Sequence, residues 1–119
     1  MLSEVFVSYR EWKDKAGYVH KECRNELHFL HREDGPAYIQ YWPGDTVHLE
    51  SFLINGLYHR YSGPAYICYN LDGSIEWEHF YVDGELLGDG KKGFWALWER
   101  LDEEGRQAPD ILKCLARYS

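Results

Sequence analysis

The sequence predicts an α+β fold that is mainly β: an antiparallel meander of β-hairpin repeats with a 28-residue period, capped by C-terminal helices. Three observations lead to this prediction. The middle of the chain repeats itself, short turn signals separate runs of β-forming residues, and the C-terminal segment changes to helical spacing. A chain of 119 residues has room for one core, so residues 1–119 are expected to form a single domain.

The internal repeat is visible in an alignment without gaps. Residues 31–58, HREDGPAYIQYWPGDTVHLESFLINGLY, align with residues 59–86, HRYSGPAYICYNLDGSIEWEHFYVDGEL, at an offset of 28. The two segments share identical residues at 11 of 28 positions: His31/His59, Arg32/Arg60, Gly35/Gly63, Pro36/Pro64, Ala37/Ala65, Tyr38/Tyr66, Ile39/Ile67, Tyr41/Tyr69, Glu50/Glu78, Phe52/Phe80 and Gly56/Gly84. Such agreement without a gap indicates a true repeat.

Each repeat is expected to run strand, tight turn, strand, tight turn. Asn-Gly and Asp-Gly favour type I′ hairpin turns, because both central residues of that turn need positive φ. These pairs occur at Asn55-Gly56, Asp72-Gly73 and Asp83-Gly84, and Pro43-Gly44-Asp45 matches Asp72-Gly73 in the other repeat. The runs between the turns are rich in Tyr, Ile, Val, Phe and Trp, which suit a half-buried strand. Gly-Pro-Ala is expected at strand entries, where the missing N–H of proline costs nothing.

The two ends of the chain are expected to cap this array. Residues 1–30 resemble a degenerate N-terminal hairpin, and residues 92–119 predict a helical cap. In the cap, the apolar residues Phe94, Leu97, Trp98 and Leu101 follow helical spacing. Gly105 is expected to end this first helix, and Pro109 to begin a second. Helices that cover the open face or edge of the sheet would protect it from aggregation.

Charge and cysteine content exclude several classes of protein. Thirteen Lys and Arg against 20 Asp and Glu give a net charge of −7, which argues against a nucleic-acid binder that neutralises phosphates. No segment approaches the roughly 20 apolar residues that span a bilayer. Glu4 stands where a secretory signal carries positive charge. Three widely spaced cysteines favour reduced thiols. We therefore expect a cytoplasmic protein with no membrane partner.

The repeats resemble those of MORN-like, toxin–antitoxin-associated β-hairpin repeat proteins of bacteria and phages. Asn55-Gly56, His59-Arg60 and Gly63-Pro64-Ala65 match one unit of that pattern, and Phe80, Tyr81 and Asp83-Gly84 match another. The resemblance covers about residues 28–88. The 28-residue period, and His-Arg where His-Gly is usual, depart from the eukaryotic pattern. The resemblance implies a twisted hairpin array that binds something and has no catalytic residues to transfer.

Two constellations suggest chemistry but have simpler interpretations. His20, Cys23, His28 and His31 have ligand types that zinc uses. The four-residue gap between the two pairs is too short for a finger loop, so histidines on a partly exposed sheet are the favoured interpretation. The cysteines lie in no nucleophile motif; we expect Cys68 to tolerate exposure and Cys114 to fill the core. We therefore expect neither metal, cofactor nor enzymatic activity.

The pairs His31-Arg32 and His59-Arg60 place two cations on an acidic chain. Arginine forks recognise carboxylate or phosphate groups, so Arg32 and Arg60 are candidate binding residues. The alternative is structural: each arginine ties its turn to a neighbouring acid such as Asp34, Glu33 or Glu50. The sequence favours the structural interpretation and leaves the other open.

The leading functional hypothesis is a non-catalytic protein-interaction module, a small phage or bacterial inhibitor or immunity-type protein that binds a host protein. The candidate contact residues are the aromatic side chains Tyr41, Trp42, Tyr69 and Trp77, because exposed aromatic residues are enriched in binding surfaces. The alternative is a small-molecule binder that sequesters an anionic, nucleotide-type ligand, between subunits if the chain is a homo-oligomer. Arg32 and Arg60 would then hold the phosphates.

Overall fold

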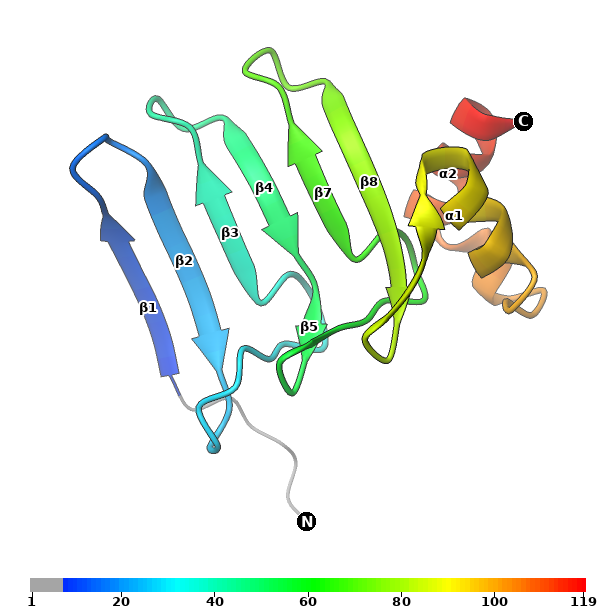
Figure 1. Cartoon of the computed structure of the whole chain (residues 1–119), viewed down its shortest axis with the longest axis horizontal. Coiled ribbons are helices and arrows are strands. Elements are labelled where there is room, and N and C mark those ends of the chain that lie inside the picture. Colours follow the sequence, from blue (N-terminus) through cyan, green and yellow to red (C-terminus); the bar gives the residue numbers. More distant parts are fainter. Residues whose placement is uncertain (1–7) are drawn as a thin grey trace.

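The computed structural model describes residues 8–119 and shows a fold that is mainly antiparallel β with helices at its C-terminal end (Figure 1). The main sheet contains, in spatial order, β1 (Ser8–Lys13), β2 (Val19–Arg24), β3 (Tyr38–Tyr41), β4 (Val47–Ser51), β7 (Tyr66–Tyr69), β8 (Ile75–Val82) and β9 (Glu85–Asp89). The predicted α+β class is therefore confirmed. Within the predicted N-terminal hairpin, β1 and β2 pair with each other, and residues 1–7 lie outside the described residues.

The sheet differs from a continuous meander at one place. β5 (Leu53–Ile54) and β6 (Leu57–Tyr58) form a separate two-stranded hairpin. In the main sheet β4 therefore pairs directly with β7. This hairpin is held by the preceding segment instead: the N–H of Gly56 donates to the carbonyl of Leu30, and the N–H of Arg32 donates to the carbonyl of Leu53. Its backbone groups are thus satisfied outside the main sheet, as buried backbone requires.

The turn predictions are confirmed at two of three positions. Asn55 and Gly56 have φ values of 49° and 81°, and Asp83 and Gly84 have 51° and 83°, as a type I′ turn requires. Asp72-Gly73 is a correction, because only Gly73 has positive φ there. The Asp72 carboxylate instead accepts hydrogen bonds from the N–H and the hydroxyl of Ser74, which is the local chemistry of a wider turn.

The helical cap contains α1 (Gly90–Trp98), a 3₁₀ turn (Gly105–Gln107) and α2 (Pro109–Tyr118). Pro109 begins α2, as predicted. Two predictions for the first helix are wrong: Leu101 lies beyond its end, and Gly105 begins the 3₁₀ turn rather than capping α1. The guanidinium of Arg106 donates two hydrogen bonds to the Trp98 carbonyl, at 3.2 and 2.9 Å, so that carbonyl needs no glycine cap.

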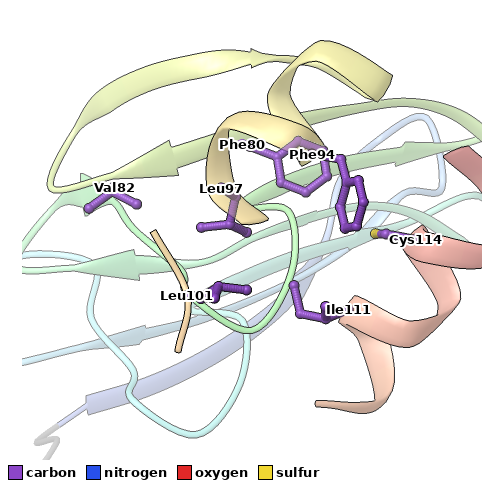
Figure 2. Packing of buried hydrophobic residues seen from close by; sticks show 7 residues of the cluster. All are labelled: Phe80, Val82, Phe94, Leu97, Leu101, Ile111 and Cys114. Atoms are coloured by element: carbon purple, nitrogen blue, oxygen red, sulfur yellow. The ribbon is translucent and has the colours of Figure 1, made fainter. Parts of the chain in front are cut away.

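The main buried cluster lies where the helices meet β8 (Figure 2). It is formed by Phe80, Val82, Phe94, Leu97, Leu101, Ile111 and Cys114. Each large apolar side chain buried here contributes about 1.5–3 kcal/mol to folding. The molecule as a whole measures 43 × 40 × 21 Å, and Figure 1 shows both helices gathered at the β8–β9 end of the sheet. Within residues 8–119, the β1–β4 end of the main sheet therefore has no helix packed on it.

Candidate binding surface

Strand pairing defines two faces of the sheet. Ile39 pairs with Glu50, Glu50 with Ile67, and Ile67 with Glu78, so these four side chains share one face. The Glu78 carboxylate accepts hydrogen bonds from Arg117 and Tyr118 of α2, both at 2.5 Å. We call this the helix face, and the opposite side the open face.

Tyr41 and Tyr69 both lie on the helix face. Each is two residues beyond Ile39 or Ile67 in its strand, and side chains two apart point to the same side. The Tyr69 hydroxyl donates to Glu50 at 2.7 Å, and Lys21 lies 5.0 Å from the Tyr41 ring centroid. Burial and the bond to Glu50 raise the pKa of Tyr69. Both rings are half-buried, on the part of this face that the helices leave uncovered.

The two tryptophans are placed elsewhere. Trp77 pairs with Cys68, so it lies on the open face, with 51 % of its surface exposed. The indole N–H of Trp42 donates to the Tyr69 carbonyl at 3.3 Å, and its ring lies 4.0 Å from that of His48. Trp42 therefore anchors the β3–β4 turn against β7. The structure does not bring the four predicted aromatic residues into one surface.

The histidines of the two His-Arg pairs have a structural role. His31 Nδ1 accepts a hydrogen bond from the N–H of Asn55 at 3.0 Å, and His59 Nδ1 accepts one from Asp83 at 2.9 Å. Each histidine thus holds the Asn-Gly or Asp-Gly turn that follows 24 residues later. The same contact recurs at an interval of 28 residues, which explains why a polar residue is buried at His31.

The arginines adopt the same conformation in both repeats. A Cβ placed on Gly35 would lie 3.0 Å from Cζ of Arg32, and one on Gly63 would lie 2.9 Å from Cζ of Arg60. Each guanidinium therefore packs over its glycine.

Their partners differ. Arg32 Nε donates to Asp34 at 2.8 Å, which agrees with the structural interpretation and raises the pKa of Arg32. Arg60 reaches Asp110 of α2 at 2.6 Å and also donates to Ser62 and the Pro64 carbonyl.

Both arginines line one cleft, which we call the inter-repeat cleft. It has a volume of about 600 Å³ and lies between the loops 32–35 and 59–62, within the range of ligand sites. Phe52 and Ile54 provide apolar lining, and His59 and Asp83 also line it. The Arg60 guanidinium lies 3.8 Å from the Phe52 ring centroid. Sequence reasoning did not single out Phe52 or Ile54, although the repeat aligns them with Phe80 and Val82.

The candidate metal and nucleophile residues have other partners. His20 contacts Asp14 at 2.9 Å and Tyr38 at 2.7 Å, and the bond to His20 lowers the pKa of Asp14. Within residues 8–119, no group of three or more His, Cys, Asp or Glu side chains is arranged to hold a metal ion. Cys114 is buried in the core, as expected, and burial raises its pKa to about 11. Burial also raises the pKa of the half-buried Cys68.

No family model, curated protein or solved structure matches this chain. Among the described residues, neither helix has the length and apolar character needed to cross a bilayer.

Proposed function

We propose that this chain is a non-catalytic protein-interaction module, an array of β-hairpin repeats that acts in the cytoplasm and binds a host protein as an inhibitor or immunity-type protein does. The observation that carries the proposal is the uncovered part of the helix face. There, Tyr41 of β3 and Tyr69 of β7 lie on the same face, with β4 between their strands. Half-buried tyrosines on a rigid sheet are the kind of residue that anchors a protein interface.

Charge supports a protein partner with a basic surface. The net charge of −7 would steer such a partner to the chain and increase the rate of association. The same charge repels nucleic acid, whose binding depends on cationic contacts to phosphate. We therefore place the interface on the helix face between β2 and β7, with Tyr41 as its test position.

The experiment is native mass spectrometry of the chain purified gently from host lysate. We expect a co-purifying protein, and Tyr41→Ala should reduce the amount bound at least tenfold, because truncating a hot-spot tyrosine costs about 2 kcal/mol or more. Trp77→Ala is the matched control, since Trp77 lies on the opposite face. If Trp77→Ala abolishes binding of the partner and Tyr41→Ala does not, the interface lies on the open face and the proposal is wrong.

The second candidate function is sequestration of an anionic, nucleotide-type ligand, favoured by one observation: Arg32 and Arg60 line the same cleft. Against it, Arg60 is already engaged by Asp110, Ser62 and Pro64, so one cation of the pair is largely neutralised. In the same experiment, a small mass that dissociates on denaturation and is lost in Arg32→Glu would favour this function over a protein interface.

A further inference from the structure

The inter-repeat cleft has a counterpart one repeat later that is already filled. Arg32, Gly35, Phe52 and Ile54 line the cleft. The residues 28 positions later are Arg60, Gly63, Phe80 and Val82, which we call the terminal site. Phe80 and Val82 are 0 % and 3 % exposed beneath the helices, whereas Phe52 and Ile54 are only half-buried. The chain therefore contains two versions of one site, one covered and one open.

What fills the terminal site is the start of α2. The Asp110 carboxylate binds Arg60 at 2.6 Å, and Cβ of Asp110 would lie 3.3 Å from a Cβ on Gly63. The next residue, Ile111, is fully buried in the same cluster as Phe80 and Val82, as Figure 2 shows. An acidic residue thus binds the arginine, and the branched aliphatic residue after it joins the apolar cluster that contains Phe80 and Val82.

The open cleft offers the same two features to an incoming chain. The side chain of Arg32 is 40 % exposed, and its partner Asp34 is 85 % exposed, so their ion pair lies in water and is weak. A carboxylate from outside can replace Asp34 at little cost. The Arg60 guanidinium lies over the Phe52 ring, so the apolar surface left for an aliphatic side chain is that of the half-buried Ile54 and the rest of Phe52.

We propose that the inter-repeat cleft is the docking site for a segment of a partner protein in which an acidic residue is followed by a branched aliphatic residue, in imitation of Asp110-Ile111. This inference rests on the proposed function and adds a second contact to it: the acidic segment of the partner enters the cleft, whereas a basic surface of the same partner faces Tyr41 and Tyr69, which do not line the cleft. The exposed guanidinium of Arg32, and the way the chain's own helix engages the equivalent Arg60, define the occupant. Glu33, Asp34 and Asp83 also line the cleft, so the carboxylate of the occupant has to reach Arg32 itself.

The test uses the full ¹⁵N-labelled chain and a synthetic peptide with the sequence of residues 107–119, under reducing conditions. We expect saturable chemical-shift changes centred on Arg32, Gly35 and Ile54. Replacing Asp110→Lys in the peptide, or Arg32→Glu in the chain, should weaken binding at least tenfold. Combining the two charge reversals should restore it. Lys15→Glu, at an exposed turn position, is the control with the same change of net charge.

Several results would overturn the inference. No saturable binding, or equal binding by the wild-type and Asp110→Lys peptides, would remove the charge-recognition argument. Shifts centred on Phe80 and Val82 would mean that the peptide only displaces the chain's own α2. Shifts at Arg32 that grow with protein concentration in the absence of peptide would assign the cleft to a second copy. Binding of ATP at Arg32 with no peptide binding would assign it to a small anion.

The peptide test needs no natural partner, so its outcome is separable from that of the proposed function. Failure of the peptide with successful capture of a Tyr41-dependent partner would refute the cleft alone. Success of the peptide with no captured partner would leave the cleft assignment standing and refute the proposed host-protein interface. The dispersed spectrum of Arg32→Glu checks that the variant remains folded.

Discussion

The second repeat, residues 59–86, and the first, residues 31–58, have closely related sequences but different surroundings. Phe80 is fully buried under two helices, while its counterpart Phe52 is half-buried, with the Arg60 guanidinium over its ring. Arg60 forms an ion pair with Asp110 of α2, while Arg32 pairs with its exposed neighbour Asp34. The difference shows that position in the array, rather than local sequence, determines whether a repeat residue stabilises the fold or remains available for binding.

The largest expected effect comes from the two phenylalanines. Phe80→Ala should cost about 3–5 kcal/mol of stability, because it opens a cavity in the main core. Phe52→Ala should cost only about 1–2 kcal/mol, since its ring is partly exposed and loses one cation–π contact. Urea unfolding followed by far-UV circular dichroism measures both values. Equal losses for the two variants would mean that the first repeat is as well covered as the second.

The arginines should differ in the same direction. Arg60→Gln should cost about 1–2 kcal/mol, because Arg60 is 13 % exposed and makes three side-chain contacts, although Asp110 is partly screened by water. Arg32→Gln should cost less than about 1 kcal/mol, as expected of an exposed ion pair. Thermal unfolding at fixed pH measures the shift in midpoint. The comparison fails if Arg32→Gln is the more destabilising change.

At high pH the fold should lose stability as its half-buried tyrosines ionise, Tyr118 of α2 among them. Burial and the bond to Glu78 raise the pKa of Tyr118 to about 12, from an ordinary value of 10.0. Between pH 10 and 12 the unfolded chain has lost this proton and the folded chain keeps it, so stability falls as pH rises. Tyr118→Phe should flatten that slope in urea unfolding. Tyr61→Phe, at an exposed loop tyrosine, should leave it unchanged; identical slopes for all three proteins would exclude Tyr118 as the cause.

The smallest expected effect lies in the first repeat at mildly acidic pH. Burial lowers the pKa of His48 below its ordinary value of 6.5, and its ring packs against Trp42 and Tyr18. As pH falls below about 6.5, the unfolded chain binds a proton that the folded chain resists, so stability decreases. His48→Gln should reduce this dependence in unfolding titrations between pH 7 and 5. The control is His28→Asn at an exposed turn, and a similar reduction there would point to general charge effects instead.

The sequence by itself determined the local structure of this protein. The class of the fold, the turns at Asn55-Gly56 and Asp83-Gly84, and the start of α2 at Pro109 follow from rules that act over a few neighbouring residues. The bond of Arg32 to Asp34, one of the three acids proposed as its partner, follows for the same reason, since the two residues are only two positions apart.

Only the tertiary structure decided which side chains share a surface. Trp77 pairs with Cys68, the residue before Tyr69, so the alternation of side chains along a strand puts Trp77 and Tyr69 on opposite faces. Nothing in that alternation says which face the helices cover. The bond from Arg60 to Asp110 spans 50 residues, and the end of α1 depends on Arg106 reaching back to Trp98. Such contacts form only when distant segments pack together. The repeat therefore predicts two equivalent sites, and only packing at the end of the sheet covers one and leaves the other open.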